Sequence, residues 1–108
     1  MFTEELRYRL MRLIEEKPGM SQRDAARELG ISLGRVNFCV QALIRQGWVK
    51  AVRFKNSRNK LAYRYLLTER GIEEKVVLTL EFLRTKMLEY ETLCAEIERI
   101  EQDVKRRA

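Results

Sequence analysis

The chain of 108 residues contains no histidine, two cysteines, one proline and one tryptophan. Without histidine there is no Ser-His-Asp triad, no Cys-His pair, no histidine metal ligand and no histidine pH switch. Two cysteines 55 positions apart, Cys39 and Cys94, cannot form a four-ligand zinc site or a CxxC redox motif. We therefore expect a protein that is not an enzyme, with no catalytic residue, metal or cofactor.

Long apolar runs are also missing. No stretch approaches the roughly 18 residues that a transmembrane helix needs, and the first residues lack a signal-peptide layout. We expect a cytoplasmic protein without a membrane partner, whose thiols stay free in a reducing compartment. With 45% hydrophobic and 35% charged residues, the length suits one small domain plus an appendage.

Acidic residues are absent from forty consecutive positions, Leu29 to Thr68. The same tract carries eight basic residues: Arg35, Arg45, Lys50, Arg53, Lys55, Arg58, Lys60 and Arg64. Residues 1–67 have 14 basic and 6 acidic side chains (+8), whereas residues 68–108 have 8 and 10 (−2), which together make the net +6. This segregation predicts a polyanionic partner for the first part of the chain.

Helical spacing of apolar residues predicts helices over 3–17, from Ser21 to Gly30, and over 33–46. Residues 48–54 and 61–67 are rich in aromatic and branched side chains around a turn-forming segment, which predicts two strands. Two helices joined by a tight turn and followed by a hairpin indicate a winged helix-turn-helix over residues 1–67. The predicted class is mainly α with a small β-hairpin (α+β).

Residues 68–108 predict one long helix, capped by Thr68 and reaching about Arg106. Its roughly 58 Å exceed the span of a small domain, so its apolar side cannot be covered by its own domain. Apolar residues three or four apart indicate a coiled coil with a second copy of the chain. The expected dimerisation residues are Leu80, Leu83, Met87, Tyr90, Cys94, Ile97, Ile100 and Val104.

The predicted third helix has an apolar stripe and, opposite it, a polar row of Asn37, Gln41 and Arg45. Asn and Gln can bind adenine through two hydrogen bonds, and Arg can bind guanine or phosphate. A solvated helix face is the alternative, and the acid-free tract favours DNA. The expected DNA contacts are Ser21, Gln22, Arg23, Ser32, Gly34, Arg35, Asn37, Phe38, Gln41, Arg45, Lys55, Asn56, Arg58, Asn59 and Lys60.

Several of these side chains have a second interpretation. Ser21 is equally well a plain N-cap, and the turn at Arg58, expected in a minor groove, also suits a basic solubilising loop. Cys39 suits a small core filler better than a sensor, and Cys94 a packing residue of the long helix, although paired Cys94 thiols could oxidise. The aromatic residues Trp48, Tyr63 and Tyr65 are expected in the hairpin core rather than as a stacking platform.

The segments 21–39, 42–50, 54–60 and 65–75 resemble the small MarR-type regulators associated with exopolysaccharide gene clusters. The likeness is most specific over 30–50 and 56–60, while Leu67-Thr-Glu-Arg-Gly71 is a broader MarR-type feature. It implies a winged helix, double-stranded DNA as the partner and a homodimer. Effector binding is not carried over from the larger relatives, because the first helix is shorter here, and a small-molecule effector stays unknown.

The leading hypothesis is a homodimeric transcriptional regulator with its third helix in the major groove of a pseudo-palindromic operator and its wing on the flanking groove. The alternative is a winged-helix module that binds an acidic protein or RNA and uses its long helix for a heteromeric partner.

Overall fold

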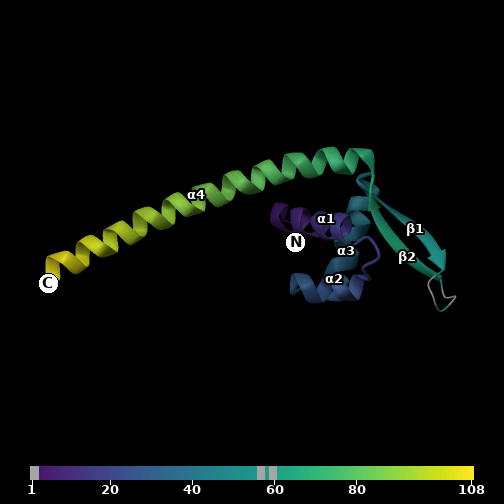
Figure 1. Cartoon of the computed structure of the whole chain (residues 1–108), viewed down its shortest axis with the longest axis horizontal. Helices are drawn as coiled ribbons and strands as arrows, with labels where there is room; N and C mark the ends of the chain where they lie inside the picture. Colours follow the sequence, from purple (N-terminus) through teal and green to yellow (C-terminus); the bar gives the residue numbers. More distant parts are fainter. Residues whose placement is uncertain (1–2, 56–57, 59–60) are drawn as a thin grey trace.

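The computed structural model describes residues 3–55, 58 and 61–108. Its elements are α1 (Glu4–Glu16), α2 (Gln22–Leu29), α3 (Leu33–Arg45), β1 (Val49–Lys55), β2 (Leu61–Leu67) and α4 (Glu69–Arg107). Helices α1 to α3 gather into one body, from which the β1-β2 hairpin and the free end of α4 project in opposite directions (Figure 1). This order confirms the predicted winged helix-turn-helix with a long C-terminal helix.

Hydroxyl side chains begin the helices where the sequence places them. The side chains of Thr3, Ser21 and Ser32 each accept a backbone N–H three residues on at 3.1 Å, and Thr68 does so at 3.0 Å. Each such cap contributes about 1 kcal/mol. Helix α2 ends at Gly30, whose φ of 68° lies in the left-handed region that glycine adopts without strain.

The core lies where α1, α2 and α3 meet the base of the hairpin. Its fully buried side chains are Leu10, Met11, Val36, Cys39, Val40, Leu43 and Val49. The inward stripe predicted for α3 is thereby confirmed, and Cys39 occupies the core position expected of a small apolar filler.

The hairpin differs from expectation in two details. Strand β1 begins at Val49 rather than Trp48, because the Trp48 N–H donates to Leu43 O at 3.0 Å and its carbonyl accepts from Thr68 N at 3.0 Å. Trp48 is buried, but Tyr63 is 50% exposed, so its placement in the hairpin core was wrong. The Arg53 guanidinium lies over the Tyr63 ring, 5.7 Å from its centroid, instead of a core side chain.

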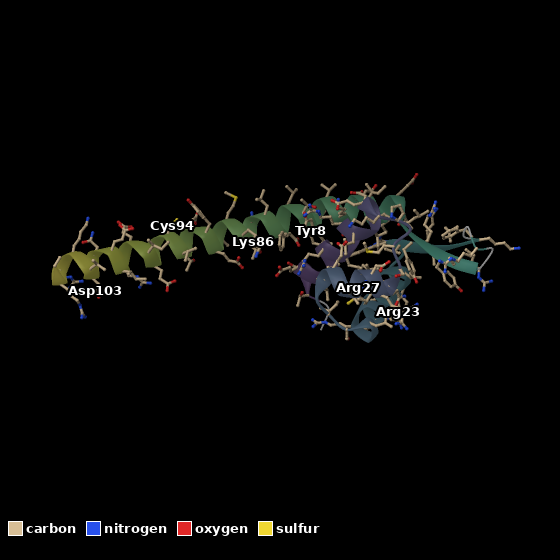
Figure 2. All side chains as sticks on the ribbon, turned by 60° about the horizontal axis from the view of Figure 1, so that its bottom comes forward. Tyr8, Arg23, Arg27, Lys86, Cys94 and Asp103 are labelled. Carbon is tan, nitrogen blue, oxygen red and sulfur yellow. The ribbon has the colours of Figure 1, made fainter. Side chains whose placement is uncertain are left out.

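Helix α4 packs on its own domain only at its base. Leu78 is buried against the core, and the Phe82 ring stacks on Tyr8 of α1 with centroids 4.8 Å apart. Figure 2 shows Tyr8 close beneath α4 and Cys94 far beyond the domain. The domain therefore covers Leu78 and Phe82, whereas the predicted apolar row that begins with Ile72, Val76 and Leu80 stays exposed.

Beyond Phe82 the helix leaves the domain, and the molecule reaches 70 Å along its longest axis. All eight predicted dimerisation residues are exposed. The exposed fraction of the large apolar residues among them runs from 46% for Ile97 to 68% for Tyr90. Within the residues that the structure describes, no helix has the length and apolar character needed to cross a membrane.

Candidate nucleic-acid interface

Helix α3 presents one continuous polar face to solvent. Gly34, Asn37, Gln41 and Arg45 are all exposed, on the side opposite the buried stripe of the same helix. They occupy positions three or four apart, so their side chains lie in a row along about three turns. Amide and guanidinium groups in such a row can donate to and accept from base edges in a major groove.

Phe38 breaks the polar character of this face, since its ring is 58% exposed. An aromatic ring among hydrogen-bonding side chains can contact the methyl group of thymine. Ser32 and Arg35 lie at the start of the helix, both exposed, with the Ser32 hydroxyl engaged as the N-cap. The first turn of α3 carries no acidic residue, so its positive helix end is not neutralised locally.

The start of α2 lies beside this face. The Ser21 hydroxyl accepts the Asp24 N–H at 3.1 Å, which confirms its role as an N-cap. Arg23 is exposed, and Arg27 instead forms an ion pair with Asp24 at 2.6 Å. Figure 2 shows Arg23 and Arg27 on the side of the domain away from α4. A phosphate contact by Ser21 or Arg23 stays a prediction.

Gln22 has a structural role that the sequence did not reveal. Its half-buried side chain donates from Nε2 to the Tyr65 hydroxyl at 2.9 Å and to Asn37 Oδ1 at 3.4 Å. It therefore joins α2, α3 and β2 in addition to any contact with DNA. No sequence pattern could have revealed this link, because Gln22 and Tyr65 lie 43 positions apart.

The hairpin carries an arginine on each of its faces, and each arginine lies over an aromatic ring of the other strand. The Arg53 guanidinium carbon is 5.7 Å from the centroid of Tyr63, its direct partner in the ladder. The Arg64 guanidinium carbon is 4.9 Å from the ring centroid of Phe54, its diagonal neighbour on the opposite face. Such stacking limits the motion of a long side chain while the charge remains available.

The two arginines do not face the same way. Side chains two residues apart in a strand share a face, so Tyr63 and Tyr65 share one face of β2, together with Arg53 of β1. Tyr65 touches Gln22, so this is the face that continues toward α2 and α3, whereas Arg64 lies on the other face. In the sequence Arg53 stands out only as part of the basic tract, because the contact between Gln22 and Tyr65 is what identifies its face of the hairpin.

At the end of the hairpin the structure describes Lys55 and Arg58, and both are exposed. The predicted contacts Asn56, Asn59 and Lys60 lie outside the described residues. The end of the hairpin thus carries two exposed cations among the described residues.

Ion pairs outside the acid-free tract join separate elements of the described chain. Lys17 pairs with Glu28 at 2.6 Å and Lys75 with Glu15 at 2.5 Å. Hydrogen bonding by Glu28 raises the pKa of Lys17. The acidic partners belong to α1, α2 and α4, because the tract from Leu29 to Thr68 contains none.

Two further features of the described part of the chain, the Cys39 thiol and an apolar hollow, offer little for catalysis or ligand binding. Burial raises the pKa of the Cys39 thiol, which disfavours the reactive thiolate and favours a packing role. The apolar hollow between α1, α2 and Tyr65 has a volume of about 20 Å³, enough for about one water. A small-molecule effector does not fit into this hollow.

A family model described as "Winged helix-turn-helix DNA-binding" matches residues 3–50. The chain folds as a winged helix-turn-helix. The match covers α1 to the start of β1, including the helix-turn-helix and the whole polar face of α3. No curated protein matches the sequence closely enough to count as a relative.

Solved structures share this winged helix-turn-helix. The PcaV transcriptional regulator from Streptomyces coelicolor, in complex with its natural ligand, has a TM-score of 0.69 and 22% identity, over 94% of this chain and 70% of that chain. A Streptococcus transcriptional regulator has a TM-score of 0.67 and 17% identity, over 82% and 93%. MepR from S. aureus, in a complex with DNA, has a TM-score of 0.62 and 20% identity, over 94% and 79%.

At these identities the likeness concerns the fold. The long C-terminal helix is included, since the matches to PcaV and MepR extend over 94% of this chain. The winged helix-turn-helix fold with a long C-terminal helix that the sequence predicted is confirmed.

Proposed function

We propose that this chain is a MarR-type transcriptional regulator that binds double-stranded DNA as a homodimer. Helix α3 enters the major groove of a pseudo-palindromic operator, and the wing contacts the flanking groove. Its duplex partner places the protein in the cytoplasm. Membership of the exopolysaccharide-associated subgroup stays a prediction.

The exposed row on α3, set within the acid-free tract, is the observation that carries the proposal. Asn37 and Gln41 are exposed, and other residues form the buried side of α3. Arg53 and Lys55 add exposed positive charge on the hairpin face that continues toward α2 through Tyr65. Hydrogen-bonding groups on a helix flanked by cations meet the two needs of duplex recognition, base readout and phosphate neutralisation.

The homodimer is proposed from the two sides of α4. At about 100° per residue, Leu78 and Leu80 lie roughly 160° apart around the helix. Leu78 is 5% exposed and faces the domain, whereas Leu80 is 62% exposed. The apolar row that contains Leu80, Leu83 and Met87 is therefore separate from the domain contact, and a second copy can cover it without displacing α1.

Selection of binding sites from random duplex DNA by the purified chain tests the function. We expect an inverted repeat whose binding weakens steeply with salt, and no binding to an acidic control protein. Gln41→Ala should cost about 1–3 kcal/mol on the selected site and little on random duplex, because an uncharged amide contributes through directed hydrogen bonds. Recovery of no enriched sequence, or binding of the acidic protein instead, would favour the interaction-module alternative.

A further inference from the structure

A chain of side-chain hydrogen bonds connects the wing with the polar face of α3. Gln22, at the start of α2, donates to the Tyr65 hydroxyl of β2 at 2.9 Å. The same amide nitrogen donates to Asn37 Oδ1 of α3 at 3.4 Å. An amide nitrogen carries two hydrogens, so both bonds can exist together. Elements far apart in sequence thus meet at one side chain beside the proposed reading surface.

We infer that Tyr65 is a positioning residue for base recognition, which acts through Gln22 on the amide of Asn37. This inference rests on the proposed DNA-binding function. It assigns to a wing residue an effect on which base pair α3 prefers, in addition to the wing's electrostatic contribution.

The physical basis is the two-sided nature of an amide. The oxygen and nitrogen of Asn37 have nearly the same shape, and only hydrogen bonding decides which of them faces outward. Because Gln22 donates to Oδ1 at 3.4 Å, the Asn37 amide is biased before DNA arrives toward the orientation with its oxygen beside Gln22. The oxygen retains a second lone pair and the nitrogen both hydrogens, which suffices for two hydrogen bonds to adenine.

Tyr65 holds the other end of this link. Glutamine has a long side chain that loses substantial rotamer entropy when it is fixed, so one 3.4 Å contact with Asn37 is a weak restraint by itself. The 2.9 Å bond to the Tyr65 hydroxyl supplies the second attachment. Both Gln22 and Tyr65 are half-buried, which limits competition by water.

The test uses the full chain and its selected site. Tyr65→Phe removes one oxygen and keeps the ring. Tyr63→Phe is the matched control, because Tyr63 lies on the same face of β2 and its ring would keep its contact with Arg53. Gln22→Met breaks the same link from the other side. Affinities for the selected site and for random duplex are measured at several salt concentrations, with thermal unfolding of every variant.

Loss of one directed contact predicts that Tyr65→Phe and Gln22→Met each lower the ratio of specific to random affinity about fivefold. The salt slope should stay unchanged, since no cation is removed. Tyr63→Phe should leave the ratio as in the parent. In an Asn37→Ala background, Tyr65→Phe should have no further effect, since the side chain on which it acts is gone.

Several outcomes would overturn the inference. Equal losses on specific and random duplex would make Tyr65 a purely structural residue, as would an effect that persists in the Asn37→Ala background. Unchanged specificity in both Tyr65→Phe and Gln22→Met would show that the link does not matter. A parent chain that binds no duplex would refute the proposed function first and this inference with it, whereas the other outcomes leave DNA binding intact.

Discussion

Replacement of Gly71 by alanine tests how α4 is joined to the domain. A Cβ at this position would lie 2.0 Å from the Trp48 carbonyl oxygen and 2.9 Å from its carbon. Both are backbone atoms, so the clash cannot be relieved by a rotamer change. Ordinary contact distances require the start of α4 to move by roughly 1.5 Å.

That movement would disturb the bonds that fix the helix start. Thr68 donates from its backbone to Trp48 O at 3.0 Å and from its hydroxyl to Gly47 O at 2.6 Å. Overpacking costs about 1–3 kcal/mol, and each weakened hydrogen bond about 1 kcal/mol. The better helix propensity of alanine returns about 1 kcal/mol, so Gly71→Ala should destabilise the fold by about 2–4 kcal/mol.

Thermal unfolding followed by far-UV circular dichroism, at one fixed protein concentration, measures this effect. For a chain of this size, the Tm should fall by about 8 °C or more. Gly34→Ala is the matched control, because Gly34 also lies in the first turn of a helix but has nothing within 4 Å of its Cβ position. It should leave the Tm unchanged or raise it. A Gly71→Ala variant as stable as the parent would refute the close approach on which this reasoning depends.

Two further predictions concern the proposed dimer and the wing. Leu83→Glu combined with Met87→Glu should give a monomer in analytical ultracentrifugation while the domain stays folded. The control variant Thr85→Glu, on the far side of the helix, should stay dimeric. A dimer for both variants would place the interface elsewhere. Arg53→Gln should weaken specific and random duplex alike and lower the salt slope by about 1 in fluorescence anisotropy, and Arg64→Gln, on the opposite face of the hairpin, should do neither. Equal losses for Arg53→Gln and Arg64→Gln would contradict the assignment of one face to DNA.

Local signals predicted the element boundaries well. A hydroxyl cap or a left-handed glycine acts within a few residues, so Ser21, Ser32, Thr68 and Gly30 could be recognised without knowledge of the fold. Periodicity likewise distinguished the buried face of α3 from its exposed face, because the helical body covers most of the apolar stripe of this helix.

Long-range packing could not be predicted in the same way. Helix α4 has apolar residues on two sides, and the sequence does not say that Leu78 and Phe82 meet α1 while Leu80 stays exposed. Tyr63 and Tyr65 share one face of β2, so alternation could not tell that Tyr65 meets the domain and Tyr63 does not. In each case the distinction comes from a neighbour distant in sequence.

The stability of the fold does not explain why acidic residues are absent from one long tract. Exposed ion pairs contribute only about 0–1 kcal/mol, so a fold gains almost nothing by excluding acids from forty consecutive positions. It loses instead, because neighbouring cations such as Arg53, Lys55 and Arg64 on one small hairpin repel one another. The acids that do form ion pairs lie on α1, α2 and α4, outside the acid-free tract. Repulsion across the hairpin is relieved when phosphates approach it, and this relief is the reason to propose DNA, rather than solvent, as the partner of the basic face.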